Sequence, residues 1–111
     1  MTLSTHVLDT GLGRPAAGVP VTLARRENGT WHDVADGVTD TDGRWRAPDD
    51  VALVAGTDHR LTFATAEHLV AAGREPFFPE AAVVFRPSDP DRHHHVPLLL
   101  SPYSYSTYLG S

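Results

Sequence analysis

The chain contains no cysteine among its 111 residues, so disulfide bonds and thiol nucleophiles are excluded. It also lacks an apolar run long enough to cross a membrane. No basic segment followed by an apolar one precedes the first predicted strand, and we therefore expect a cytoplasmic protein with no membrane partner. Positive charge is scarce: 9 Lys and Arg residues stand against 14 Asp and Glu, the net charge is −5, and no basic cluster is present. This balance argues against a nucleic-acid partner.

What the sequence does contain is a series of short segments in which apolar and polar residues alternate. Turn signals separate these segments at intervals of ~8–12 residues, which is typical of β-sandwiches. No internal repeat or linker divides the chain, and its length suits one domain over residues 1–111. The sequence therefore predicts an all-β fold, a two-sheet β-sandwich of about eight strands with one short helix.

The individual elements follow from the same pattern. In the first strand, alternation places Leu3, Thr5 and Val7 on the face toward the core. Asn28-Gly29 predicts a hairpin turn, and Pro97 predicts an irregularity in its strand because proline has no N–H to donate. We expect a helix over residues 66–73, a loop over 11–15, a short strand through 44 and 46, and further strands over 2–9, 19–25, 31–36, 59–65, 81–86, 93–100 and 103–108.

Three of these strands present polar side chains on the face opposite the core. In the strand that begins at His93, alternation places His94 with the apolar residues and directs His93 and His95 outward. His6 likewise departs from the core-facing set of the first strand. In the last strand, the residues that share one face are Ser104, Ser106 and Tyr108. This surface becomes a site only if something covers it, such as another subunit.

Two histidines on one strand face suit proton transfer, binding of a divalent ion, or neither. No acidic or cysteine ligand stands nearby to complete a metal set, so we expect neither a metal nor a cofactor. The remaining histidines have no comparable context and are expected to be ordinary surface residues: His32, His59 and His68.

Four sequence motifs, separated along the chain, together reach from its beginning to its end. Residues 3–9 read LSTHVLD, residues 11–21 read GLGRPAAGVPV, and residues 38–44 read VTDTDGR; the chain ends HHHVPLLLSPYSYSTYLGS. These segments resemble the 5-hydroxyisourate hydrolases of the transthyretin-like family, whose corresponding motifs read LSTHVLD, GxGRPAAGVPV, VTNxDGR and HYHVPLLLSPxxYSTYRGS. The resemblance implies a transthyretin-like sandwich that forms a homotetramer, a dimer of dimers with sites between the dimers.

The implied activity is hydrolysis of 5-hydroxyisourate, a product of urate oxidation, by attack of water on a ring carbonyl. By resemblance, the catalytic residues are His6, Arg44 and His95. An imidazole can exchange a proton near neutral pH, and a guanidinium stays cationic beside carbonyl oxygens. One imidazole would activate water and the other would orient it or protonate the departing nitrogen. The expected substrate-binding residues are Tyr108, Ser111, His93 and Ser106.

Two alternatives stay open. The segment SPYSYST also resembles the hormone-carrying transthyretins, so a small-ligand carrier is the main rival to the enzyme. A homologue acting on another heterocycle is the second, because the chain departs from the hydrolase pattern at three places. Leu109 stands where the family has a basic residue, His94 where it has Tyr, and Asp40 where it has Asn.

Overall fold

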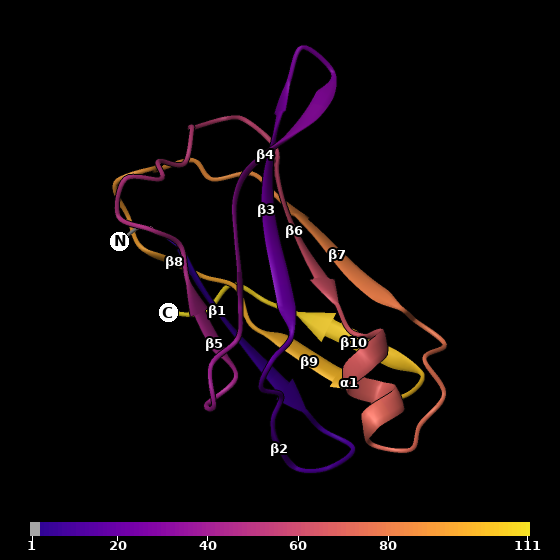
Figure 1. Cartoon of the computed structure of the whole chain (residues 1–111). Coiled ribbons are helices and arrows are strands. Elements are labelled where there is room, and N and C mark those ends of the chain that lie inside the picture. The colour runs from indigo at the N-terminus through magenta and orange to yellow at the C-terminus, as the bar shows by residue number, and fades with distance from the viewer. Residues whose placement is uncertain (1–2) are drawn as a thin grey trace.

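The computed structural model describes residues 3–111, and in it two β-sheets pack face to face (Figure 1). The six-stranded sheet consists of β1 (Leu3–Asp9), β2 (Arg14–Pro15), β5 (Arg44–Arg46), β8 (His94–His95), β9 (Leu98–Ser101) and β10 (Ser104–Thr107). The four-stranded sheet has the order β4 (Thr30–Val38), β3 (Pro20–Glu27), β6 (His59–Ala64) and β7 (Glu80–Phe85). The predicted all-β sandwich is confirmed.

Strand β1 lies at the centre of the six-stranded sheet. It pairs antiparallel with β2 and β5, and parallel with β8 and β9. Along β1, burial alternates strictly, and Leu3, Thr5 and Val7 point inward as predicted, with at most 1% of their surface exposed. The intervening residues therefore face away from the core, which places Ser4 and His6 on the outer face of the sheet. Thr2, with which the predicted strand begins, lies outside the described residues.

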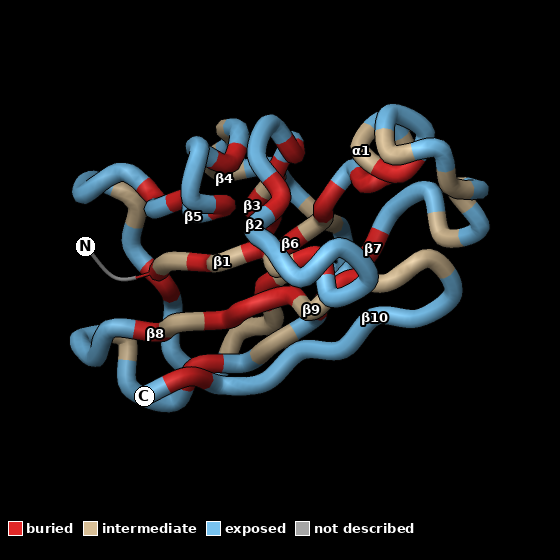
Figure 2. The backbone as a smooth tube through the Cα atoms, turned by 90° about the horizontal axis from the view of Figure 1, so that it is seen from below, coloured by how far each residue is buried: buried red, intermediate tan, exposed pale blue. Residues whose placement is uncertain are grey.

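The core is formed by apolar side chains from both sheets, and Figure 2 marks the buried positions along the backbone in red. Leu23 on β3, Leu61 and Phe63 on β6, and Leu98 on β9 are all fully buried. Burying one such side chain stabilises a fold by roughly 1.5–3 kcal/mol. The alternate residues 19, 21 and 23 in β3 and its approach, and 61 and 63 in β6, are all buried, so the alternation fixes which face of each strand remains for the site.

Pro97 interrupts its strand as predicted. β8 ends at His95 and β9 begins at Leu98, so the segment predicted as one strand over residues 93–100 is two. Across the break, the Val96 N–H donates to the carbonyl oxygen of Ser4 at 2.9 Å. The Pro97 carbonyl accepts a hydrogen bond from Thr107 Oγ1 at 2.8 Å. The proline therefore ends one ladder and begins another without separating this segment from its neighbours.

Arg14 and Pro15, predicted to lie in a loop, form the two-residue strand β2 opposite Leu8 and Asp9. With the division at Pro97, this raises the strands within residues 3–111 to ten. A proline is tolerated in β2 because the strand is at the edge of its sheet, where its missing N–H leaves no ladder bond unmade. Sequence alternation gives no signal for pairs as short as this one.

The hairpin turn at residues 28–29 and the short helix are both found where the local sequence predicts them. Asn28 and Gly29 both have positive φ, 52° and 78°, as a two-residue hairpin turn requires. The helix α1 (Ala66–Ala71) is shorter than predicted, and Gly73 follows it with φ of 73°, which suits the left-handed conformation after a helix end. No helix within residues 3–111 has the length and apolar character needed to cross a membrane.

Candidate active site

The outer face of β1 gathers polar side chains from three strands. In the register of β1 and β5, His6 lies opposite Arg44 and Ser4 lies opposite Arg46. On the other side of β1, Ser4 is the neighbour of His95 on β8. Directly paired residues project to the same face of a sheet. The pairing therefore places imidazole and guanidinium groups from distant parts of the sequence side by side.

These side chains line a pocket of about 350 Å³. We call it the imidazole pocket, and its lining residues are Ser4, Thr5, Arg44, Arg46, His93, His95 and Ser111. His6 lies next to this lining, since it pairs with Arg44 and its charge acts on His95. The volume is within the range of pockets for small molecules.

Arg44 is positioned by the turn that precedes it. The Asp40 carboxylate accepts hydrogen bonds from the backbone N–H groups of Asp42, at 2.9 Å, and Arg44, at 3.0 Å, and these bonds lower the pKa of Asp40. Gly43 has φ of 76°, and a Cβ added there would lie 2.5 Å from the carbonyl oxygen of Val7. A residue with a side chain is thus excluded at Gly43, and the turn delivers Arg44 to its place beside His6.

The imidazoles are held by specific hydrogen bonds. His6 Nε2–H donates to the backbone carbonyl oxygen of Asp42 at 2.7 Å, so the Nδ1 atom is free to accept a proton when the ring is neutral. Ser4 Oγ lies 2.8 Å from His95 Nδ1 and 2.9 Å from His93 Nε2. One serine hydroxyl therefore connects the first and third histidines of the HHH segment.

The electrostatic surroundings keep His95 neutral. Its partial burial lowers the pKa of His95 below the ordinary 6.5, and positive charge on the neighbouring His6, His93 and Arg44 side chains lowers it further, since it disfavours a second cation beside them. A neutral imidazole at neutral pH can act as a base. Beside it, the exposed guanidinium of Arg44 supplies permanent positive charge. Together the two groups can remove a proton and stabilise a developing oxyanion.

The end of the chain packs against His95. The Gly110 N–H donates to the His95 carbonyl oxygen at 2.7 Å, in an isolated antiparallel bridge. A Cβ added at Gly110 would lie 2.7 Å from Cδ2 of His95, so only glycine fits this approach. This contact brings Ser111 into the imidazole pocket.

The family model of the HIUase/Transthyretin family matches residues 3–110. The chain belongs to this family. The 5-hydroxyisourate hydrolase of Caulobacter vibrioides is 45% identical over 118 residues, which covers 98% of this chain and 97% of that protein.

Solved structures agree with this assignment. The structure of Klebsiella pneumoniae 5-hydroxyisourate hydrolase matches with a TM-score of 0.83 at 39% identity, and the match covers both chains completely. Sea bream transthyretin in complex with thyroxine matches with a TM-score of 0.87 at 31% identity, over 99% of this chain and 95% of that one. The backbone of the HIUase/Transthyretin family therefore does not by itself separate a hydrolase from a carrier, and the side chains of the site carry that distinction.

The structure brings together five of the seven site residues predicted from the family resemblance: Arg44, His93, His95 and Ser111 line the imidazole pocket, and His6 adjoins it. Ser106 lies on the same sheet face but on β10, beyond β9, where it pairs with Leu99. Tyr108 does not line the imidazole pocket and instead lines a second pocket.

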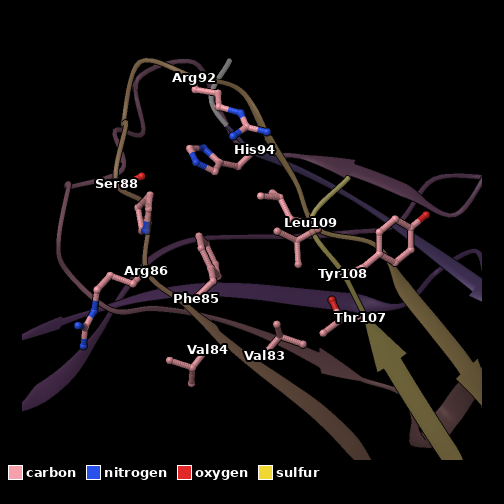
Figure 3. A pocket seen from close by; sticks show the side chains of 12 residues that line it. Val83, Val84, Phe85, Arg86, Ser88, Arg92, His94, Thr107, Tyr108 and Leu109 are labelled. Carbon is pink, nitrogen blue, oxygen red and sulfur yellow. The ribbon is translucent and has the colours of Figure 1, made fainter. Parts of the chain in front are cut away.

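This second pocket has a volume of about 270 Å³ and lies beside the ends of β7 and β10 (Figure 3). We call it the apolar pocket because Val83, Phe85, Val96 and Leu109 supply much of its lining. His94 also lines it and is buried as predicted, and its Nδ1 atom has no hydrogen-bond partner within residues 3–111. Leu109, which replaces the basic residue of the hydrolase motif, lines this pocket and does not line the imidazole pocket.

Thr5, which was expected to face the core, also lines the imidazole pocket, and two further lining residues are absent from the sequence prediction, Ser4 and Arg46. A signal was available for both, because each lies two residues from a predicted catalytic residue on the same strand and therefore on the same face. No group of three or more His, Cys, Asp or Glu side chains within residues 3–111 is arranged to hold a metal ion.

The prediction that His59 is a surface residue is wrong. Its side chain is fully buried and stacks on Phe85 at 5.5 Å between ring centroids. Nδ1–H donates to the Thr57 carbonyl oxygen at 2.8 Å, and Nε2 accepts from the Val54 N–H at 3.3 Å. Burial lowers the pKa of His59, so it fills the core as a neutral ring with both nitrogens paired. His32 is exposed as predicted.

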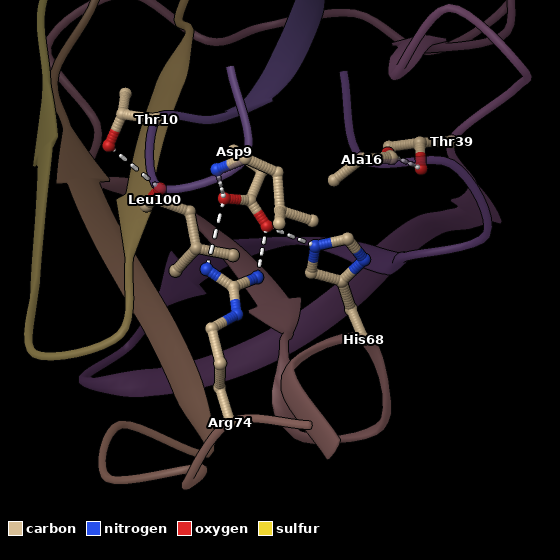
Figure 4. Close-up of polar contacts among 8 residues, drawn as sticks. Asp9, Thr10, Ala16, Thr39, His68, Arg74 and Leu100 are labelled. Carbon is tan, nitrogen blue, oxygen red and sulfur yellow. Dashed lines mark hydrogen bonds and ion pairs between the residues drawn. The ribbon is translucent and has the colours of Figure 1, made fainter. Parts of the chain in front are cut away.

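His68, also predicted to lie at the surface, is half-buried and takes part in an ionic cluster at the far end of β1 (Figure 4). Its Nε2 atom lies 2.7 Å from the buried carboxylate of Asp9, which Arg74 also contacts with two nitrogens. We call Asp9, His68 and Arg74 the Asp9 cluster. Burial alone would raise the pKa of Asp9, but the hydrogen bonds from Arg74, His68 and the Leu12 N–H lower it to about 2.

Proposed function

We propose that this chain hydrolyses 5-hydroxyisourate in urate degradation, opening the ring of a cyclic amide with activated water. The observation that carries the proposal is the meeting of His6, Arg44 and His95 at one small pocket. Relatives that share the fold over nearly full length are named as 5-hydroxyisourate hydrolases, which supports the same substrate.

In the proposed mechanism, neutral His95 accepts a proton from a water molecule as the water oxygen attacks the ring carbonyl carbon. The carbonyl oxygen then carries negative charge, and Arg44 stabilises it with guanidinium N–H donors; one preorganised donor of this kind contributes roughly 3–4 kcal/mol. The C–N bond breaks, and the proton held by His95 passes to the departing nitrogen. His6 orients the water through its unprotonated Nδ1 atom, because Nε2 is engaged by Asp42.

The proposed assembly is a homotetramer, a dimer of dimers, in which sites draw residues from more than one subunit. Several observations support it. Arg44, Arg46 and His93 are exposed in a single chain, so the imidazole pocket still lacks a cover. Strands β7 and β10 each end a sheet, and an unpaired edge is a ready surface for pairing with a second copy. Close to these edges, the exposed large side chains include Phe77, Val84, Tyr105, Tyr108 and Leu109.

In this assembly Tyr108 and Ser106 would act at a neighbouring subunit's pocket or at the interface, and their substrate-binding role remains part of the proposal. Light scattering at micromolar concentration tests the assembly, with a mass four times that of the chain expected. A monomeric mass would contradict it. The cytoplasmic location also stays a prediction.

The decisive experiment mixes the purified protein with freshly generated 5-hydroxyisourate and follows the absorbance decay against the spontaneous rate. Acceleration that is proportional to protein concentration is the expected result. No acceleration over buffer would reject the proposed activity. Saturable binding of an elongated aromatic ligand without turnover would then favour a carrier, and turnover of a related heterocycle would favour a different substrate.

A further inference from the structure

The side chain of Ser4 lies between two imidazoles. The backbone pairing of Ser4 in the sheet does not by itself require these side-chain contacts. Its Oγ atom is within hydrogen-bond distance of His95 Nδ1, at 2.8 Å, and of His93 Nε2, at 2.9 Å. The backbone around this contact is fixed on both strands: Ser4 and His95 are paired in register, and the Val96 N–H donates to the Ser4 carbonyl oxygen. The hydroxyl therefore sets how both rings are turned.

A hydroxyl group carries one proton, so it can donate to only one of two imidazoles at a time. In the first arrangement Ser4 donates to His95 Nδ1 and accepts from the protonated Nε2 of His93. The proton of His95 is then on Nε2, and the ring has no nitrogen free to accept another. In the second arrangement His95 Nδ1–H donates to Ser4, and Ser4 donates to His93 Nε2. His95 Nε2 is then unprotonated and basic.

We infer that Ser4 is a positioning residue whose hydroxyl couples the protonation of His93 to the tautomer of His95, so that His95 accepts a proton from water only while His93 is neutral. The catalytic part of this inference rests on the proposed function; the coupling between the rings does not. When His93 becomes cationic, both of its nitrogens carry protons and Ser4 must accept from Nε2. The hydroxyl proton then turns to His95 Nδ1, which selects the inactive tautomer.

The charges around the rings suit such a coupling. His6 on β1, Arg44 and Arg46 on β5, and His93 itself surround His95, while the carboxylate of Asp40, in the turn before Arg44, accepts a hydrogen bond from the Arg44 backbone N–H. No Asp or Glu side chain within residues 3–111 lines this pocket. With no Asp or Glu side chain in the lining to fix one tautomer, the hydroxyl that contacts both rings decides between the two.

Nitrogen NMR of the imidazole rings tests the coupling directly, because the two tautomers give different ¹⁵N shifts. In the parent protein we expect the His95 tautomer to change over the pH range in which His93 becomes protonated. In Ser4→Ala the His95 ring should no longer follow His93. Ser4→Thr, which keeps the hydroxyl, should restore the coupling. In His93→Gln, whose amide donates and accepts but does not titrate, the His95 tautomer should be constant over that range.

Kinetics supply the second readout. Ser4→Ala should lower kcat/KM for 5-hydroxyisourate by about tenfold with little change in KM, as expected for loss of one hydrogen bond that orients a base. On the acid side of its pH profile, kcat/KM of Ser4→Ala should depend on one proton fewer than in the parent, because the protonation of His93 no longer controls His95. Ser101→Ala removes a hydroxyl that contacts Ser104 instead, and it serves as the matched control with parental kinetics.

The outcomes separate the two proposals. If His95 titrates and changes tautomer in Ser4→Ala as it does in the parent, the inference about Ser4 is wrong, whatever the substrate. If the NMR coupling is present in the parent but 5-hydroxyisourate decays at the spontaneous rate, the coupling stands and the proposed function fails. Should Ser4→Ala not fold, the Ser4→Thr and His93→Gln spectra still decide, since pH-dependent exchange of the His95 tautomer in His93→Gln would contradict the coupling.

Discussion

Strand β1 carries a polar cluster at each end, and the two clusters use histidine in opposite ways. Near its start, Ser4 and His6 meet His95 among positive charges and hydroxyls, with no Asp or Glu side chain in the lining of the imidazole pocket within residues 3–111. At its end, Asp9 is a buried carboxylate that His68 and Arg74 surround.

The comparison teaches what makes a histidine cluster chemically active. In the Asp9 cluster, a buried carboxylate that is ionised at neutral pH is paired with His68 and Arg74, and the cluster connects β1 to the helix region. In the imidazole pocket, positive neighbours keep His95 unprotonated, and the hydroxyl of Ser4 can accept or donate. We therefore expect changes in the imidazole pocket to alter the rate of hydrolysis and changes in the Asp9 cluster to alter the stability of the fold.

The largest effect is expected from removing the imidazole at His95 or His6. His95→Ala should lower the rate of 5-hydroxyisourate hydrolysis by about 10²–10⁴-fold, because it removes the proposed base, and His6→Ala should fall in the same range. The measurement is the absorbance decay at saturating substrate. His32→Ala, which alters an exposed histidine on the other sheet, should keep the parental rate. Near-parental rates in both active-site variants would exclude the assigned roles.

A large effect on stability, without a comparable effect on rate, is expected at the other end of β1. Asp9→Ala leaves Arg74 partly buried without its carboxylate, and breaking a buried ion pair in this way costs about 3–5 kcal/mol. Urea unfolding measures the loss, and the rate per folded molecule should remain within about threefold of the parent. Equal loss of rate and stability would show that the two ends of β1 do not act separately.

Acidification should affect the two clusters in sequence. As pH falls below the ordinary histidine range, His95 becomes protonated and activity is lost, although its lowered pKa delays this loss to below 6.5. The pKa of Asp9 is lowered from 3.8 to about 2, so its stabilisation, roughly 2 kcal/mol, is complete above pH 4 and is lost as pH falls from 4 to 2. Activity and unfolding measured across pH 2–8 should therefore show activity declining while the Asp9 contribution is still intact.

Asp9→Asn sharpens this experiment. The variant has no carboxyl group to titrate, so its unfolding free energy should lose the part of the acid dependence between pH 4 and 2 that Asp9 supplies. Its activity profile near neutral pH should keep the parental shape. An unchanged stability profile between pH 4 and 2 would mean that Asp9 does not carry that dependence.

The same contrast explains how much of the molecule was predictable. Strict alternation fixed the inward and outward faces of β1 and β6, and with them the outward direction of His6. The same alternation placed His94 inward and His95 outward on β8. Alternation does not show which residues of neighbouring strands pair, however. The pairing of Ser4 with His95 and of His6 with Arg44 is therefore known only from the structure. Period-2 reasoning also cannot tell that a histidine is neutral and paired in the core, and for that reason His59 was misplaced.

The smallest effect is expected from restoring the family's basic residue at Leu109. Within one protomer Leu109 lines the apolar pocket, about half of its surface is exposed, and it does not line the imidazole pocket. Leu109→Arg should therefore change kcat/KM by less than about threefold, since a surface charge that does not contact the reacting groups contributes little. Steady-state kinetics and light scattering of parent and variant provide the measurement. A tenfold decrease in KM at unchanged mass would instead place residue 109 next to the substrate bound by a neighbouring subunit. The imidazole pocket at the start of β1 would then include a residue from across the interface.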